Sequence, residues 1–154
     1  MKGCTITFDG TIKYLNPTDW TKYEDGTDRD YTLNTMVEIP EFWALTVVTD
    51  DNIELRLYQH EVKGAEHFPK AYCSAYEGYN NNKVLKSINN GTVKPTVSID
   101  RSTSQQYARA NGSDNWNIYT YKVHKAIALL YIVEYANMNG QLNVNDQLTA
   151  EGSK

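Results

Sequence analysis

The side chains of this chain that could do chemistry are few in kind and scattered along it. Its three histidines, His60, His67 and His124, share no helical or hairpin spacing that would suit a metal ion. No serine stands in the strand-to-helix elbow that exposes a nucleophile, and the sequence has no glycine-rich phosphate loop. We therefore expect no catalytic residue, no metal site and no cofactor, and we do not interpret the chain as an enzyme.

The cysteines and one acidic segment could suggest metal or redox chemistry. Cys4 and Cys73 have no companions at metal-ligand spacing, so we expect two separate buried thiols, with a disulfide as the alternative. Segment 24–30 is rich in carboxylates but lacks the remaining ligands of an EF-hand loop. We interpret it as a solvated loop.

Glu134 is unusual because it lies inside the apolar run 126–135. A helix that is apolar on nearly every side is normally enclosed, and a buried carboxylate must be paired or hydrogen-bonded. We expect Glu134 to bind a neighbouring backbone or Arg109, with a catalytic role as the alternative.

Composition limits the class of protein. The chain has 154 residues, enough for one domain, which we divide into 1–33, 34–100, 101–140 and a polar tail, 141–154. Its net charge is −4 and no basic stripe is present, which argues against nucleic acid and anionic lipid as partners. Twelve tyrosines stand against three phenylalanines. Tyrosine is common at recognition surfaces, although half-buried strand positions also favour it.

Strand patterns fill the first part of the chain. Residues 4–8 and 11–15 alternate around Asp9-Gly10, which predicts a hairpin. A turn at 16–19 should lead into a short helical piece around Trp20 and Tyr23. Further strands are predicted at 36–40, 42–48, 53–58 and 71–76, with a turn at 78–82 and a return strand at 83–87. In 53–58, alternation predicts one buried and one wet face.

Two helices follow the strands. Ser102 or Thr103 can cap the first, and Asn111-Gly112 suits a left-handed C-cap. Thr120 can cap the second, which should run to about Asn137 and be buried against strands of 37–58 and 71–76. The fold class predicted is α+β, an antiparallel or mixed sheet packed against two helices. Between the helices, Trp116 is expected to pack back onto the domain rather than to serve as an exposed anchor.

Several motifs occur in an order typical of one group of proteins. Residues 37–43 read V-E-I-P-E-F-W, residues 75–78 read A-Y-E-G, and K-Y-L with D-W-T-K-Y-E-D-G-T stands upstream. The order R-x-x-G, W, Y, L, E-Y, N-x-Q is matched by Arg109, Gly112, Trp116, Tyr119, Leu130, Glu134, Tyr135 and Gln141. The chain resembles phage tail-fibre or receptor-binding proteins, in the N-terminal part of their C-type-lectin-like, formylglycine-generating-enzyme-like domain.

This resemblance implies a C-type-lectin-like fold and a non-enzymatic recognition module on a phage or prophage tail. Its ligand would be a host-surface glycan or protein, and the ligand-binding candidates are Tyr76, Tyr79 and Trp116. Structural roles fall to Arg109, Gly112, Trp116, Leu130 and Glu134. The alternative is a structural or assembly protein of a virion or bacterial surface, with no ligand of its own.

Members of the group continue beyond the second helix, so we expect a truncated fold with open strand edges. The hairpin of 4–15 and at least one strand within 37–58 should keep such an edge. Self-association, as a trimer, or other tail proteins would cover these edges. The sequence has no N-terminal secretory signal and no apolar run long enough to insert in a membrane. The expected location is the virion tail, after synthesis in the bacterial cytoplasm.

Overall fold

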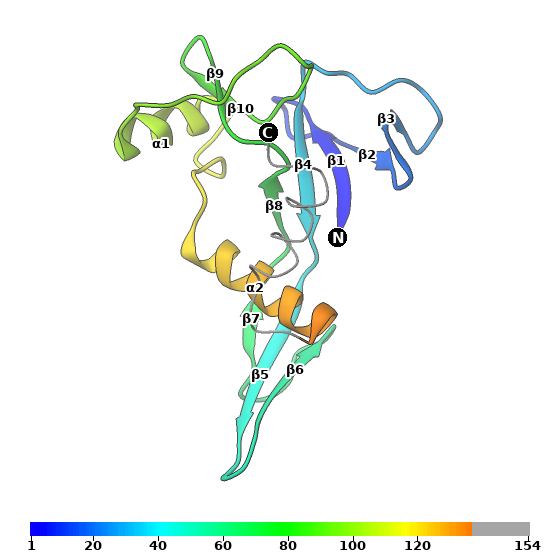
Figure 1. The fold of residues 1–154 in the computed structure, drawn as a ribbon, viewed down its shortest axis with the longest axis vertical. Coiled ribbons are helices and arrows are strands. Elements are labelled where there is room, and N and C mark those ends of the chain that lie inside the picture. The colour runs from blue at the N-terminus through cyan, green and yellow to red at the C-terminus, as the bar shows by residue number, and fades with distance from the viewer. Residues whose placement is uncertain (137–154) are drawn as a thin grey trace, which may run out of the picture. The chain divides into compact units, whose positions relative to one another are not determined.

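A computed structural model describes residues 1–136 (Figure 1). The predicted α+β class is confirmed, because mostly antiparallel strands are combined with two helices. The chain divides into two compact units that alternate along the sequence. Unit 1 contains 1–40 and 70–120, and unit 2 contains 41–69 and the chain from Tyr121 onward. Each unit is described separately below.

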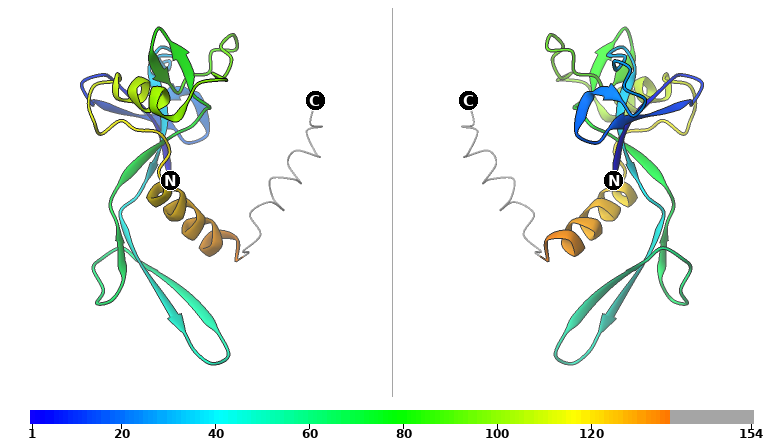
Figure 2. Two further views of the ribbon diagram at one scale, coloured as in Figure 1. Left: turned by 90° about the vertical axis from the view of Figure 1, so that its left-hand side faces the viewer. Right: turned by 90° about the vertical axis from the view of Figure 1, so that its right-hand side faces the viewer.

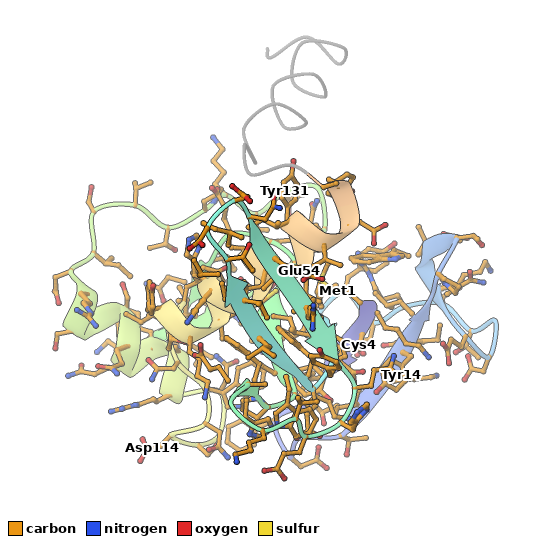
Figure 3. The ribbon with its side chains drawn as sticks, turned by 90° about the horizontal axis from the view of Figure 1, so that it is seen from below. Met1, Cys4, Tyr14, Glu54, Asp114 and Tyr131 are labelled. Atoms are coloured by element: carbon orange, nitrogen blue, oxygen red, sulfur yellow. The ribbon has the colours of Figure 1, made fainter. Side chains whose placement is uncertain are left out.

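Unit 1 is built on a five-stranded antiparallel sheet in the order β3-β2-β1-β4-β8. The strands are β1 (Lys2–Ile6), β2 (Ile12–Asn16), β3 (Asp19–Tyr23), β4 (Asn34–Ile39) and β8 (Ala71–Ser74). The predicted hairpin around Asp9-Gly10 is confirmed, with Cys4 opposite Tyr14. Figure 3 shows these two labelled side chains close together.

One face of this sheet carries an apolar core cluster of unit 1. Cys4, Ile6 and Met36 are buried there, and half-buried side chains pack on them: Ile12, Tyr14, Tyr72 and Trp116. The prediction that Trp116 packs back onto the domain is therefore confirmed. The indole belongs to the core although the loop residues around it are exposed.

The short helical piece expected around Trp20 and Tyr23 is wrong, because these residues form β3. Leu15 pairs with Tyr23 in register, and Tyr23 is 4% exposed. Its hydroxyl accepts hydrogen bonds from Thr5 Oγ1 and from Asp30 N, both at 3.1 Å. Aromatic and threonine side chains favour strands, and the tertiary hydrogen bonds of one tyrosine hold this strand to the sheet.

The turn expected at 78–82 is centred on Asn82 and Lys83 instead. β9 (Tyr79–Asn81) and β10 (Val84–Lys86) form a separate two-stranded sheet. Asn82 and Lys83 between them have φ of 51° and 66°, the left-handed pair that a two-residue hairpin requires. β10 is thus the partner of β9, whereas β8 pairs with β4.

The first predicted helix is confirmed as α1 (Arg101–Arg109), but its cap is different. Asp100 is the N-cap: its Oδ1 accepts the Thr103 N–H at 2.9 Å and its Oδ2 the Thr103 hydroxyl at 2.7 Å. Ser102 and Thr103, predicted as caps, therefore lie inside the first turn. The helix exit needs glycine, because Gly112 has φ +141° and a Cβ there would lie 2.7 Å from the Phe8 carbonyl oxygen.

Unit 2 contains a three-stranded sheet in the order β6-β5-β7. β5 (Phe42–Val48) and β6 (Ile53–Tyr58) have the predicted bounds and form a long hairpin (Figure 2), while β7 (Glu66–Phe68) pairs with the start of β5. Phe42 and Phe68 stack at 4.8 Å and are both buried. The expected buried face of 53–58 is wrong at its start, because Ile53 is 78% exposed.

The second predicted helix is confirmed as α2 (Tyr121–Tyr135), which begins directly after Thr120. Its predicted burial is wrong: Ala126 is its one buried residue, Leu130 is half-buried and Glu134 is exposed. The sheet of unit 2 is narrow, and α2 meets it through polar contacts such as Lys125 Nζ with Glu66 Oε2 at 2.5 Å. The expected end at Asn137 lies outside the described residues, and within 1–136 no helix has the length and apolar character needed to cross a membrane.

Open strand edges were expected at the hairpin of 4–15 and within 37–58; the first expectation is wrong and the second is confirmed. The hairpin of 4–15 keeps no open edge, since β1 lies between β2 and β4, and β2 pairs with β3. Strands β3 and β8 are the edges of that sheet. In unit 2, β6 is an edge strand among the described elements, as expected for one strand of 37–58.

Candidate functional site

Arg29 is the most unusual residue of unit 1, because it is a buried cation in a loop expected to be solvated. Arg29 is 7% exposed, and its backbone N–H donates to the Thr21 carbonyl at 2.8 Å. The next residue, Asp30, donates its N–H to the Tyr23 hydroxyl. The interpretation of 24–30 as a solvated loop is thus wrong at Arg29: two backbone contacts to β3 turn this end of the loop inward.

The Arg29 guanidinium is surrounded by neutral groups. Its Cζ lies 4.2 Å from the centroid of the Tyr31 ring, a cation–π contact. Nη1 donates to the Tyr76 hydroxyl at 3.5 Å and Nη2 to the Asn89 carbonyl at 3.4 Å. Both distances are long for N–H···O bonds. The buried Nε has no hydrogen-bond partner in the part of the chain that the structure describes.

No carboxylate of residues 1–136 forms an ion pair with Arg29. The adjacent Asp30 carboxylate instead accepts the Thr32 hydroxyl and N–H, at 2.7 and 2.8 Å. These bonds, the hydroxyl first, lower the pKa of Asp30. A guanidinium keeps its charge, and a buried charge without a counterion is costly. The arrangement is therefore electrostatically incomplete and suited to an anion.

The guanidinium opens on a pocket of about 580 Å³. Six residues line the pocket: Arg29, Tyr31, Tyr76, Asn89, Asn90 and Gly91. The turn 89–91 forms an exposed rim, in which Asn89 Oδ1 accepts the Gly91 N–H and Asn90 Oδ1 the Thr92 N–H, both at 3.1 Å. Because the amide oxygens are used in the turn, the two NH₂ groups remain as donors.

Among the predicted ligand-binding residues, the structure places Tyr76 in this pocket. Tyr79 lies on β9 opposite Lys86, and Trp116 is part of the core, so neither lines the pocket. Sequence reasoning missed Arg29, Tyr31 and the turn 89–91. The available signals were a single arginine in an acidic segment, a tyrosine two residues after it, and an Asn-Asn-Gly string that indicates only a turn.

Arg109 and Glu134, two of the predicted structural residues, both lie at the surface. Arg109 Nε lies 3.3 Å from Asp114 Oδ1, in an exposed ion pair. Glu134 is exposed, so the expectation of a buried carboxylate, bound to a neighbouring backbone or to Arg109, is wrong. Surface pairs of this kind contribute little to stability.

A second polar cluster surrounds Glu38 on β4. Glu38 Oε2 accepts the Tyr14 hydroxyl at 2.6 Å and the Tyr72 hydroxyl at 3.1 Å, and Lys70 Nζ lies 3.8 Å away. The Tyr14 bond is the main reason why the pKa of Glu38 is lowered, and it also raises the pKa of Tyr14. Burial, followed by the Glu38 bond, raises the pKa of Tyr72. This network joins β2, β4 and β8, and we interpret it as structural.

The prediction of separate thiols is confirmed: both cysteines are free, although Cys73 is half-buried rather than buried. Cys4 stands opposite Met36, whereas Cys73 stands opposite the next residue, Val37, so they lie on opposite faces of the sheet. Burial raises the pKa of Cys4 to about 11 and also raises that of Cys73. Thiols in this state are poor nucleophiles at neutral pH.

Metal-ligating side chains do not gather in the described chain: no three of its His, Cys, Asp and Glu residues could hold an ion together. The pocket at Arg29 is therefore the candidate site on geometric grounds. It can bind an anion and present hydrogen-bond donors and an aromatic ring beside it. Comparisons with protein-family models, curated proteins and solved structures find no match to this chain.

Proposed function

We propose that this chain is a non-enzymatic recognition module of a phage or prophage tail, which binds a host-surface structure at the Arg29 pocket. The observation that carries this proposal is a buried guanidinium that forms no ion pair with any carboxylate of residues 1–136 and faces a pocket with a tyrosine and an amide rim. An anionic ligand in the pocket would balance the charge of this group.

The pocket lining favours recognition over catalysis. Arginine, tyrosine, asparagine and glycine line it, and they offer donors and ring faces rather than a carboxylate base or an activated nucleophile. The Glu38 cluster does not lend itself to catalysis either, since Glu38 Oε2 already accepts two tyrosine hydroxyls.

The same proposal includes a C-type-lectin-like fold and location in the virion tail. Support comes from the ordered motifs, which include the Val37–Trp43 string and the Arg109 to Tyr135 series, and from the α+β architecture. Trp116, one of these motif residues, lies in the core as a structural residue of such a domain should.

Binding to surface polysaccharides tests the function. The labelled chain is applied to an array of bacterial surface glycans, together with Arg29→Met and the control Arg101→Ala, which removes an exposed arginine of α1. We expect binding by the wild type and the control, and loss of binding in Arg29→Met. Absence of wild-type binding, or binding that survives in Arg29→Met, would contradict the proposal.

A second candidate is a structural or assembly protein of a virion or bacterial surface, and one observation favours it. β6 is an edge strand, and Val48 and Ile53, opposite each other in the β5–β6 hairpin, are 71% and 78% exposed. Exposed apolar edges are templates for pairing between chains. Light scattering after size exclusion should then give a trimer that Ile53→Lys dissociates, whereas a monomer at every concentration argues against assembly.

A further inference from the structure

We infer that the Arg29 pocket recognises a saccharide through a carboxylate, as in a hexuronic acid residue. This inference rests on the proposed recognition function and names its ligand class. It comes from three features of the described residues: the unbalanced charge of Arg29, the acidic character of its loop, and the mixture of donors and ring face around the pocket.

A carboxylate ligand matches the free N–H donors and the positive charge of the Arg29 guanidinium. Arginine carries five N–H donors, and Arg29 uses two of them in long bonds to neutral oxygens of Tyr76 and Asn89. The other hydrogens on Nη1 and Nη2 can reach an acceptor in the pocket, where two carboxylate oxygens fit the planar fork. Charge-assisted bonds in a partly desolvated site are stronger than those on a surface. A neutral ligand would leave the charge uncompensated.

The surroundings favour one negative charge rather than two. Asp30 follows Arg29 directly in the chain, and its lowered pKa leaves a carboxylate there at neutral pH, whereas Asp28, on the other side, is exposed and pairs with Lys22 Nζ at 3.4 Å. The whole chain has a net charge of −4. Among the described residues, Arg29 is the single cation in the lining, so a phosphate dianion would meet more repulsion and less compensation than a carboxylate.

The rest of the pocket suits a sugar ring. Its volume of about 580 Å³ is within the range of small-ligand sites and accommodates one or two monosaccharides. The NH₂ groups of Asn89 and Asn90 and the Tyr76 hydroxyl can bind sugar hydroxyls. Tyr31 is 39% exposed, which leaves part of a flat apolar ring for the C–H face of a pyranose.

A matched pair of ligands tests the inference on the unaltered chain. Methyl β-D-glucuronoside and methyl β-D-glucoside differ at C6, where a carboxylate replaces CH₂OH, and both can be titrated by NMR with the arginine side-chain N–H signals as the readout. We expect the glucuronoside to bind about tenfold tighter or more and to shift the Arg29 signals. Equal affinity for the glucoside would overturn the inference.

Two further probes separate the source of the anion. Inorganic phosphate tests a phosphate site, and N-acetylglutamate amide tests an acidic peptide. Tighter binding of either one than of the glucuronoside overturns the saccharide assignment. Arg29→Met should abolish glucuronoside binding, Arg29→Lys should weaken it, and Arg101→Ala should leave it unchanged. If Arg29→Met does not fold, the ligand pair and the Arg29 signals of the wild type still decide.

The outcomes distinguish this inference from the proposed function. Binding of neutral polysaccharides that needs Arg29, without preference for uronic acids, would leave the recognition function standing and overturn the carboxylate. Binding of the glucuronoside without any binding to surface polysaccharides would support the pocket chemistry and contradict the host-surface function.

Discussion

Asn34 Nδ2 donates to Asn111 Oδ1 at 2.8 Å, between residues 77 positions apart in the chain, and both side chains are buried. The Asn111 NH₂ also donates to the Leu85 carbonyl at 2.6 Å and the Ala108 carbonyl at 3.1 Å. Asn34 Oδ1 accepts the Ser87 N–H at 2.8 Å. This amide pair therefore joins β4, the chain around β10 and the end of α1 within unit 1.

Asn111→Ala should lower the free energy of unfolding by about 1–3 kcal/mol, since it leaves buried partners without hydrogen bonds. Urea denaturation measures the change. The control is Asn115→Ala, at an exposed loop position, which should stay within about 0.5 kcal/mol of the wild type. Equal stability of the two variants would show that the pair does not stabilise unit 1.

Gly112→Ala should destabilise the chain more than Gly26→Ala. Both glycines have positive φ, +141° and +82°, so alanine is strained at each. A Cβ at Gly112 would also approach the Phe8 carbonyl oxygen to 2.7 Å, whereas Gly26 has nothing within 4 Å. We expect a loss of about 1 kcal/mol at Gly26 and clearly more at Gly112. Thermal melts compare them, and similar shifts would contradict the close approach.

Phe68→Ala and Leu130→Ala test how far unit 2 is packed. Phe68 is 1% exposed and stacks on Phe42, so its loss should cost about 3–5 kcal/mol. Leu130 is only half-buried, so solvent already reaches it and its truncation should cost about 1–2 kcal/mol. Denaturant melts monitored by circular dichroism give both values. A larger loss at Leu130 than at Phe68 would show that α2 is enclosed after all.

Glu38 should make stability depend on pH in the acid range. Its folded pKa lies below the ordinary 4.5, so its contribution is present above that pH and is lost as the pH falls through the folded value. The stability difference between wild type and Glu38→Gln should therefore shrink between about pH 5 and pH 3. The Tyr14 hydroxyl makes stability depend on pH in the opposite direction. Its pKa is raised above 10.0, so its contribution to the free energy of unfolding is lost as the pH rises through the folded value.

Urea melts across the pH series measure this difference, with Glu24→Gln as an exposed control outside the cluster. A wild-type advantage over Glu38→Gln that stays constant down to about pH 3 would contradict the role of the Tyr14 and Tyr72 hydrogen bonds.

Local patterns predicted the strands and helices well. The β5–β6 hairpin has the predicted bounds because alternation and a polar turn are both read within a few residues. β3 was not predicted, since its identity depends on the pairing of Tyr23 with Leu15 and on a hydrogen bond from Thr5. Propensity alone cannot supply such contacts.

Burial and the candidate site were harder to predict. Glu134 was expected inside because it lies in an apolar run, and Ile53 because of the alternation in 53–58, but the narrow sheet of unit 2 leaves both exposed. Arg29 was expected outside because its neighbours are acidic. Its pocket combines residues from 29 to 91, and only the folded backbone brings such distant positions together.

The pairing of Ile39 with Ala71 means that the chain leaves the sheet of unit 1 and returns to it at neighbouring positions. For unit 1, segment 41–69 is a single insertion at the tip of a hairpin. Loop-closure entropy grows only slowly with length, so such a segment can lengthen, shorten or be exchanged at small thermodynamic cost. The tip of β4 and β8 is thus a natural position for evolutionary diversification, and for grafting foreign sequences by design.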